Sequence, residues 1–455
     1  MPFVDLRDTI ASLKRFGDLY EVEEELSPKY EVSSFLWLAS LTMEKAILFR
    51  KVKGHNIPVV ANVTFSRKVI SLGMDVKTEE LVPVFAQRIK TPIEPQIVTE
   101  GPVKEEVVPT VNLMKTLPAL THYAGDSGAF ITTGLVSARD PDTGVIGRGI
   151  YRMELRGENE LGIALHNPPV ADIYRKFKDK GEPLPVAVVI GVEPITFLAT
   201  ALIFPPWVDK LTIAGGLRGS PVDVTPSAVV DIPVPAHAEF LLEGELDTKD
   251  ERQDGPLGEI SGYYLTIPKT PTFKVKRISH RDSPFYHALL PTGKEADLLL
   301  TFTAEASFSS RLRELFPFVL DFHFIPRTFG SSIVVRVKEM GREHIRSLIL
   351  HLLSLGMIKK VVVVDEKVKA EEPEEVEWAI ITRCQPDKDS IVIPGLKGQA
   401  IDPSCSETFQ TAKLGIDATG FDSVKGWVRV SFPKDSFSKM QSLLKSEDDS
   451  EKSRR

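Results

Sequence analysis

The sequence predicts an α+β protein: an antiparallel barrel or sandwich in the middle of the chain, between a mixed N-terminal region and a C-terminal α/β domain. Residues 119–315 form short strand-like segments separated by turn signals such as DPDTG and RGEN. Residues 1–110 mix helical and strand patterns. Residues 316–434 alternate apolar strands with amphipathic helices, which is typical of a layered α/β domain.

The composition excludes several classes of protein. The 455 residues carry 56 Lys and Arg against 63 Asp and Glu, and this net charge of −7 argues against a dedicated nucleic-acid binder. The 2 cysteines cannot support a disulfide scaffold or a zinc finger. The N-terminus has no uninterrupted apolar run, so we expect no signal peptide and a cytoplasmic location.

In the N-terminal region, residues 6–19 have helical apolar spacing and residues 45–65 have the pattern of strands. Residues 74–89 are predicted to be helical, with Pro83 near a helix start. Residues 91–118 contain several prolines and predict an extended connector.

In the middle of the chain, residues 170–180 predict a helix. The most apolar stretch, residues 185–207, is interrupted by Glu193 and several prolines, so it cannot be a membrane span of about 20 apolar residues. We interpret this stretch as two buried strands with a turn at Glu193 and Pro194.

The C-terminal part predicts a strand pair over residues 322–339 and helices over 343–357 and 373–383. Between these helices, KKVVVVDE is typical of a buried parallel strand with a polar end. Residues 435–455 are rich in charge and predict a flexible tail.

The densest group of chemically active residues is DGPLGEISGYY, which contains Asp254 and Glu259. A Gly/Pro turn between two acids can fold both toward one point, where one carboxyl keeps its proton and serves as an acid. By spacing alone, a solvated acidic loop is the commoner explanation. Arg152, in an apolar strand, needs an anionic partner or lies on the outer strand face, and His166 follows the next strand.

Three glycine-rich segments, AGGLRGS, PGLKG and KLGIDAT, could bring backbone N–H groups close to an anion, although each alone is more simply a tight turn. None of them matches a P-loop or a Rossmann fingerprint, so ATP and NAD are poorly supported as cofactors. The residues by themselves therefore predict an anion-binding enzyme with a pair of acids.

Taken together, the motifs resemble the UbiD family of decarboxylases, which use prenylated FMN. The resemblance covers roughly residues 1–430 and is carried by GIYR, IAGGLRGSPV, VPAHAEFLLEGEL, DGPLGEISGYY, WAIITRCQPDKD and KLGIDAT, in that order. It implies a split β-barrel domain of the flavin-reductase type over residues 111–315, between an N-terminal α/β region (1–110) and a C-terminal α/β oligomerisation domain (316–434).

The resemblance also implies roles for individual residues. Arg152 would hold the substrate carboxylate, Glu259 would deliver the proton that replaces CO2, and Asp254 would fix Arg152 and tune the acid. The cofactor-binding residues would be Ile150, Tyr151, Arg152, His166, Lys210 and Lys413.

The sequence departs from the family pattern at three positions. Asp254 stands where the family usually has Glu. The metal that bridges the flavin phosphate, usually Mn²⁺, has its expected ligands at Gly147 and Lys210, and neither can bind a metal ion. We therefore expect Lys210 to pair with the phosphate directly and the metal to be doubtful, with Asp209 as a weak alternative ligand.

The family resemblance implies reversible, non-oxidative decarboxylation of an α,β-unsaturated acid. The chain length and archaeal-looking composition favour the branch that converts trans-anhydromevalonate 5-phosphate to isopentenyl phosphate, with Arg148, Arg218 and Arg327 as candidate phosphate ligands. The alternatives are an aromatic acid of the hydroxybenzoate type and, in another class, a non-catalytic flavin-binding subunit. Expected partners are a flavin prenyltransferase, as cofactor supplier, and further copies of the chain in a dimer or hexamer, without nucleic acid or a membrane span.

Overall fold

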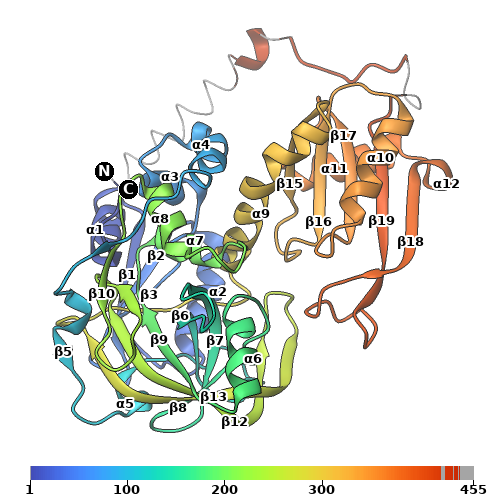
Figure 1. Cartoon of the computed structure of the whole chain (residues 1–455). Helices are drawn as coiled ribbons and strands as arrows, with labels where there is room; N and C mark the ends of the chain where they lie inside the picture. The colour runs from blue at the N-terminus through green and yellow to red at the C-terminus, as the bar shows by residue number, and fades with distance from the viewer. Residues whose placement is uncertain (1, 422–425, 434, 439, 441–455) are drawn as a thin grey trace.

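The chain folds into two lobes, seen in the computed structural model, which describes residues 2–421, 426–433, 435–438 and 440 (Figure 1). The larger lobe holds the N-terminal and central elements, the smaller lobe holds the C-terminal sheet, and the long helix α9 (Lys294–Leu315) lies between them. Most of the tail expected over residues 435–455 lies outside the described residues. No helix in the described ranges combines the length and apolar character needed to cross a bilayer.

The N-terminal elements form a four-stranded sheet in the order β1-β2-β3-β14. The first helix begins after Asp5, whose carboxylate accepts the Asp8 N–H, and it ends before Gly17, which has a φ of 74°. It is therefore shorter than the helix expected over residues 6–19. Pro83 is the third residue of α4, where its missing N–H leaves no helical hydrogen bond unmade. The bounds are α1 (Leu6–Arg15), β1 (Leu19–Leu26), α2 (Glu31–Thr42), β2 (Ala46–Val52), β3 (Val59–Ala61), α3 (Arg67–Met74), η1 (Thr78–Glu80), α4 (Leu81–Arg88) and β14 (Tyr286–His287).

The connector after α4 is mostly extended, as expected from its prolines. It contains only short elements: β4 (Gln96–Ile97), η2 (Pro102–Lys104), β5 (Glu106–Val107) and α5 (Leu113–Thr116). Strand β4 pairs with β10 (Asp223–Pro226), which in turn pairs with β11 (Pro233–Pro235).

The central strands form a sheet that closes on itself. Strand β12 pairs with β9 on one side and with β13 on the other, and the ring continues through β8, β7 and β6 back to β9. The sequence left a barrel and a sandwich open, and the pairing shows a closed ring. The helix expected over residues 170–180 is confirmed as α6. The bounds are β6 (Phe130–Arg139), β7 (Ile146–Leu155), β8 (Glu160–Ile163), α6 (Val170–Lys180), β9 (Leu184–Ile190), β12 (Phe240–Gly258) and β13 (Tyr264–His280).

Two interpretations of the central segment were wrong. After β9 the chain forms helix α7 (Pro194–Ala201) instead of a second strand, because the Glu193 carboxylate accepts the N–H groups of Ile195 and Thr196 and starts the helix. The first five residues of the AGGLRGS segment belong to helix α8 (Lys210–Arg218), and only its end, from Gly219, forms a turn. Its glycines allow close helix packing: a Cβ on Gly216 would stand 2.6 Å from the Thr91 carbonyl oxygen.

The smaller lobe is a five-stranded sheet in the order β15-β16-β17-β19-β18, in which β16, β17 and β19 run parallel. The valine run of β17 is buried on both faces, with α10 packed on one side and α11 on the other. The expected strand pair, buried strand and two helices are confirmed, whereas KLGIDAT is part of β19 and PGLKG lies largely in β18. The bounds are β15 (Val319–Phe324), β16 (Ser332–Val337), α10 (Arg342–Leu353), β17 (Lys360–Asp365), α11 (Pro373–Arg383), α12 (Pro386–Asp389), β18 (Ser390–Lys397) and β19 (Gln410–Ala418).

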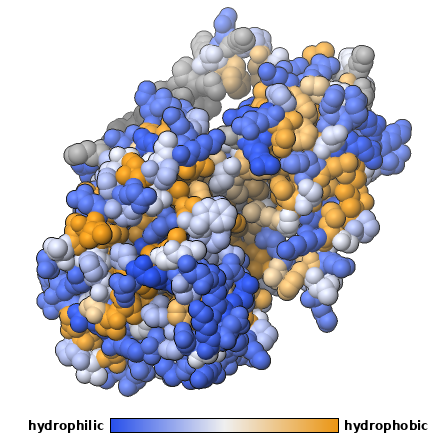
Figure 2. Space-filling view, in the orientation of Figure 1, coloured by the Kyte–Doolittle hydropathy of each residue, from blue (hydrophilic) through white to orange (hydrophobic). Residues whose placement is uncertain are grey.

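Helix α9 was missed in the sequence, where its residues were assigned to the strand-rich region. It contacts α4 and α7 of the larger lobe and β15 of the smaller lobe. Because it packs on more than one side, its apolar residues do not form the single stripe by which an amphipathic helix is recognised. Figure 2 shows the molecular surface hollowed between the two lobes, with apolar residues at depth and hydrophilic residues around them.

Candidate active site

Arg152 lies on β7, in the wall of the closed sheet. Within this strand only Ile150 and Arg152 are not fully buried, and the alternation of side chains along a strand places both on one face. The Arg152 guanidinium lies 6.0 Å from the centre of the Phe130 ring. Ile150 and Arg152 therefore mark the part of β7 that a ligand can reach.

Two carboxylates converge on Arg152. Asp254 Oδ1 accepts hydrogen bonds from Nε at 2.9 Å and from Nη2 at 2.5 Å, while Glu259 Oε1 accepts from Nη1. Gly255 makes the bend between the acids possible, because its φ is 86° and a Cβ there would stand 2.8 Å from the Leu265 carbonyl oxygen. The structure thus brings together Arg152, Asp254 and Glu259. The turn between the two acids had suggested that they converge, whereas Arg152 was associated with them only by resemblance.

Asp254 and Glu259 differ in their exposure and in the number of hydrogen bonds that they accept from Arg152. Burial raises the pKa of both carboxyls, and the positive charge of Arg152 offsets this rise only in part. The Asp254 side chain is fully buried, and its Oδ2 has no partner among the described residues. The Glu259 side chain is 21% exposed and receives one guanidinium N–H, against two for Asp254. Glu259 is therefore the acid better placed to exchange a proton with a ligand.

The other residues predicted near the cofactor on this lobe lie on both sides of β7. His166 follows β8 and is exposed; partial burial of its ring and the nearby charge of Arg152 both lower its pKa. Tyr151 is buried on the opposite face of β7 from Arg152, and its hydroxyl donates to the Asn167 carbonyl at 2.8 Å. The Tyr151 side chain therefore supports the strand from behind, and only its backbone can face a ligand on the Arg152 side.

Lys210 is the first residue of α8 and is only 5% exposed. Its ammonium donates to the Thr200 carbonyl at 2.9 Å, which leaves two N–H donors for another acceptor. Burial lowers the pKa of Lys210 to about 8, so it is mainly charged at neutral pH. A buried ammonium with spare donors at a helix start is a suitable partner for a phosphate group.

The residues around Lys210 do not form a metal site. Asp209 caps α8, and its two carboxylate oxygens accept hydrogen bonds from Arg148 at 2.8 and 3.1 Å, so it is already neutralised. A Cβ on Gly147 would stand 2.5 Å from the Ile173 side chain, so this position has no room for a ligating residue without rearrangement. Across the described ranges, no three His, Cys, Asp or Glu side chains are grouped so that they could hold a metal ion.

Lys413 does not join this cluster. It lies on β19 of the smaller lobe, and its buried ammonium donates to the carbonyls of Leu353 and Leu355 at 2.9 and 2.5 Å. In the part of the chain that the structure describes, no hydrogen bond or ion pair joins Lys413 to Arg152 or Glu259. Its position gives it a structural contact at the end of α10.

A cavity of about 660 Å³ begins beside the turn that carries Glu259. It lies between the first turns of α2, the start of α9 and the β15–β16 loop of the smaller lobe. Its volume falls within the range of about 300–1,000 Å³ usual for small-molecule sites. The lining residues are Ser33, Ser34, Trp37, Leu38, His122, Tyr123, Ile260, Ser261, Gly262, Thr292, Asp297 and Arg327.

Most of this lining could not be predicted from the sequence. Tyr123 packs its ring against Gly258, and its hydroxyl lies 2.5 Å from that of Thr292. The THYAGDS segment that carries His122 and Tyr123 matches no functional motif, and only the presence of two aromatic polar residues beside a glycine turn could have drawn attention to it.

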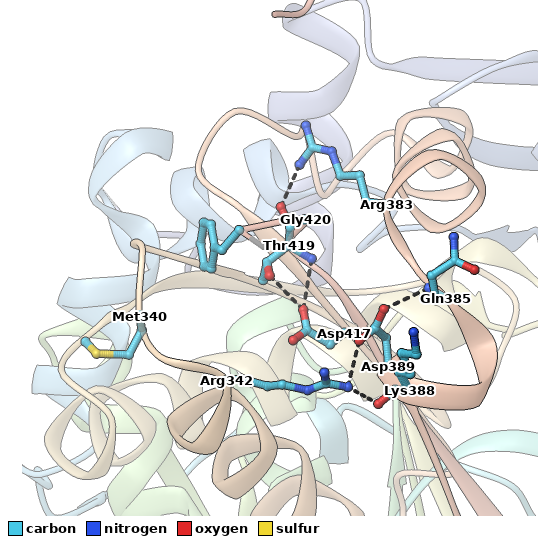
Figure 3. A pocket seen from close by; sticks show the side chains of 10 residues that line it. Met340, Arg342, Arg383, Gln385, Lys388, Asp389, Asp417, Thr419 and Gly420 are labelled. Atoms are coloured by element: carbon cyan, nitrogen blue, oxygen red, sulfur yellow. Dashed lines mark hydrogen bonds and ion pairs between the residues drawn. The ribbon is translucent and has the colours of Figure 1, made fainter. Parts of the chain in front are cut away.

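A second cavity, of about 380 Å³, lies at the carboxyl ends of the parallel strands in the smaller lobe (Figure 3). Its charged groups are largely paired with neighbours: Arg342 with Asp389 at 2.7 Å, and Asp417 with the Thr419 hydroxyl at 2.7 Å. Arg383 donates to the Thr419 carbonyl at 3.2 Å. The Arg383–Thr419 contact joins the WAIITRCQPDKD and KLGIDAT motifs to each other.

Comparison with known proteins identifies the family of the chain. Family profiles of 3-octaprenyl-4-hydroxybenzoate carboxy-lyase (UbiD) match it in three consecutive parts: the N-terminal domain at residues 10–89, the Rift-related domain at 96–294 and the C-terminal domain at 297–418. An anhydromevalonate phosphate decarboxylase from Methanosarcina mazei is 33% identical over 419 residues, which cover 91% of this chain and 95% of that protein. The chain belongs to the UbiD family of decarboxylases.

Other relatives match this UbiD-family protein over a similarly large share of both chains. The anhydromevalonate phosphate decarboxylase from Methanothermobacter thermautotrophicus is 29% identical and covers 90% of this chain and 96% of its own length. The solved structure of the UbiD-class enzyme HmfF from Pelotomaculum thermopropionicum, in complex with FMN, has a TM-score of 0.90 and 32% identity, covering 94% and 97% of the two chains. The apo 3,4-dihydroxybenzoic acid decarboxylase from Enterobacter cloacae has a TM-score of 0.88 and 26% identity, covering 95% and 98%.

Proposed function

We propose that this UbiD-type decarboxylase binds prenylated FMN and converts trans-anhydromevalonate 5-phosphate to isopentenyl phosphate and CO2. The observation that carries the proposal is the cluster of Arg152 with two acids, one buried and one partly exposed, whose pKa values are raised. The substrate is supported by the relatives from two archaeal species, which are named as anhydromevalonate phosphate decarboxylases.

In the proposed reaction, the bond between the α-carbon and the carboxylate breaks, CO2 leaves, and a proton takes its place on the same carbon. Glu259 supplies that proton, because it is the more accessible of the two acids. When Glu259 is protonated, its ion pair with Arg152 weakens, and Nη1 becomes free to hold the substrate carboxylate. Asp254 remains on Nε and Nη2 and keeps the guanidinium in place.

The residues present fit a flavin phosphate better than they fit a metal-bridged one. Bound prenylated FMN would supply the electron sink for the cleaved bond. Lys210, with two spare N–H donors, would hold the phosphate, while Ile150 and His166 would face the flavin beside Arg152. The usual metal positions hold Gly147 and Lys210, and Asp209 is paired with Arg148, so the proposed phosphate contact needs no metal ion. One Mn²⁺ per flavin in purified holoprotein would contradict this assignment.

An aromatic acid is the second candidate substrate. It is favoured by structural similarity to 3,4-dihydroxybenzoic acid decarboxylase, at a TM-score of 0.88. We also propose that the chain forms a homo-oligomer and receives its cofactor from a flavin prenyltransferase. One solved relative is described as an evolved dimeric form in complex with prFMN, which supports both the cofactor and an assembly of subunits in the family.

The test is co-expression with a flavin prenyltransferase, followed by absorbance and mass analysis of the bound cofactor. CO2 release is then compared for trans-anhydromevalonate 5-phosphate and for 4-hydroxybenzoate. We expect release from the phosphorylated acid, and a loss of about 10²–10⁴-fold in Glu259→Gln, which keeps the cofactor but cannot donate the proton. Release from 4-hydroxybenzoate alone would support the aromatic alternative. If neither acid releases CO2 and the Glu259→Gln variant behaves like the wild type, a non-catalytic flavin-binding subunit would be favoured.

A further inference from the structure

Beside the cavity near Glu259 lie buried polar atoms that have no hydrogen-bond partner in the described part of the chain. These atoms are Ser33 Oγ, both ring nitrogens of His122 and Asp297 Oδ1. His122 Nδ1 lies 3.8 Å from Asp126 Oδ2, which is too long for a hydrogen bond. Ser33 and His122 are only 2% and 3% exposed. A buried polar group without a hydrogen bond destabilises the folded state, so such a group in a native protein usually binds a ligand or an ordered water molecule.

The positive charge of the cavity lining comes from one side chain among the described residues. Of the described residues that line it, Arg327 is the only one that carries a permanent positive charge. Burial lowers the pKa of His122 to about 3, so its ring is neutral at physiological pH and offers one donor and one acceptor. The carboxylate in the lining, Asp297, has a raised pKa because of burial, and the backbone N–H and the charge of Arg327 offset this rise in part. Its Oδ2 accepts the Arg327 backbone N–H at 3.1 Å.

The Arg327 guanidinium has no anionic partner within ion-pair distance among the described residues. It lies in the loop between β15 and β16 with a φ of 62°, a left-handed conformation that non-glycine residues adopt at a cost and that is common at ligand-binding sites. Its guanidinium stacks over the Trp37 ring at 4.7 Å. Among the residues that the structure describes, the guanidinium makes no hydrogen bond or ion pair, so its N–H groups are available to an anion.

The other two candidate phosphate ligands are placed elsewhere. Arg148 is 1% exposed and donates to Asp209, Ser137 and the Pro233 carbonyl, so its donors are in use. Arg218 lies at the end of α8, with Glu193 at 3.8 Å, and does not line the cavity.

Two helices begin at the cavity, and each has acidic residues in its first turn: Glu31 in α2, and Glu295 and Asp297 in α9. Ser33 and Ser34 lie in the first turn of α2, and Asp297 lies in the first turn of α9. Neither helix has a side-chain hydrogen bond at its N-cap. The dipole of a helix favours an anion at this end, and the unpartnered Ser33 hydroxyl adds a donor.

From these observations we infer that the cavity is the subsite for the phosphate group of the substrate, with Arg327 as its ion-pair partner and Ser33 and His122 as hydrogen-bonding groups. The inference rests on the proposed function and deepens it. The cavity begins at Ile260, directly after Glu259, so a substrate whose carboxylate reacts at Arg152 can extend its other end into this space. The smaller lobe would then take part in substrate selection, because its β15–β16 loop carries Arg327.

The test is Arg327→Gln in the holoenzyme, assayed with trans-anhydromevalonate 5-phosphate and with the same acid lacking phosphate. We expect KM for the phosphorylated acid to rise by about 10–100-fold, with kcat little changed, and the kinetics of the unphosphorylated acid to stay the same. Arg327→Lys should keep part of the affinity. Arg15→Gln is the matched control, because Arg15 is also exposed and stacks over a ring, Phe16 at 5.0 Å, but does not line the cavity.

A binding measurement separates this inference from the proposed function. Calorimetry with isopentenyl phosphate and with isopentenol should show that the wild-type protein prefers the phosphate and that Arg327→Gln loses the preference. If the wild type decarboxylates the phosphorylated acid and Arg327→Gln does so with unchanged KM, the subsite is wrong and the function stands. If the wild type releases no CO2 from that acid, the proposed substrate is wrong. The subsite then stands if isopentenyl phosphate binding depends on Arg327, and it is overturned if the wild type does not bind this probe.

Discussion

Replacing Asp254 with asparagine removes the negative charge that holds Arg152 from the buried side, with little change of shape. Two effects follow for the proposed proton donor, Glu259, and both lower its pKa. The repulsion between the two carboxylates disappears, and Arg152, which has lost an anionic partner, is drawn more strongly to Glu259.

The size of the effect follows from the geometry. Two carboxylates on one guanidinium are separated by roughly 5 Å, given ordinary hydrogen-bond lengths. At an effective dielectric constant of about 20 their repulsion is about 3 kcal/mol, or about two pKa units as an upper bound. We therefore expect the pKa of Glu259 to fall by about one to two units in Asp254→Asn.

The assay is the pH dependence of kcat for CO2 release. Because only protonated Glu259 can donate, activity is lost as the pH rises through its pKa, so the basic limb should move to lower pH. Above that pKa, kcat should drop about tenfold for each unit of the shift. Asp250→Asn is the control, since Asp250 lies on the same strand but pairs with Arg252 near the surface. A basic limb that stays in place or moves to higher pH in Asp254→Asn would refute the coupling between the two acids.

Three further predictions concern the cofactor, the packing and the buried histidine. FMN affinity, measured by flavin fluorescence quenching, should fall as the pH rises from 7 to 9, because Lys210 loses its proton near pH 8. The Lys210→Met variant should bind FMN weakly at every pH. A wild-type affinity that does not depend on pH would contradict the contact between Lys210 and the phosphate. Gly216→Ala should lower the free energy of unfolding in urea by about 1–3 kcal/mol, because its Cβ meets backbone atoms, whereas Gly356→Ala, with nothing within 4 Å, should not. The folded-state pKa of His122 is depressed from 6.5 to about 3, so between these values the unfolded chain binds a proton that the folded chain does not, and stability falls as the pH falls. His122→Gln should flatten the wild-type decline between pH 6 and 4 by about 1.4 kcal/mol per pH unit, and identical slopes would show that His122 is not buried as a neutral ring.

The sequence by itself determined the strand that is buried on both faces and the helices that bury a single face. The four-valine run of β17 is apolar throughout because helices cover both faces of its sheet, and α6, α10 and α11 each present one apolar stripe. It also supplied the residues of the site, since the resemblance to the UbiD family rests on motifs whose order along the chain is visible without a structure.

Only the tertiary structure decided which of those residues meet. Asp254 and Glu259 lie about a hundred positions from Arg152, and no local pattern shows that strands β7, β12 and β13 close into one ring that brings them together. Lys413 matched a family motif, but its ammonium is used by carbonyls at the end of α10. Helices α7 and α9 were hidden because burial against several neighbours removes the amphipathic period. Arg327 was one candidate among three in the sequence, and it was distinguished only when the fold placed it beside Trp37 with its donors free, because the availability of a charge depends on contacts that the local sequence does not encode.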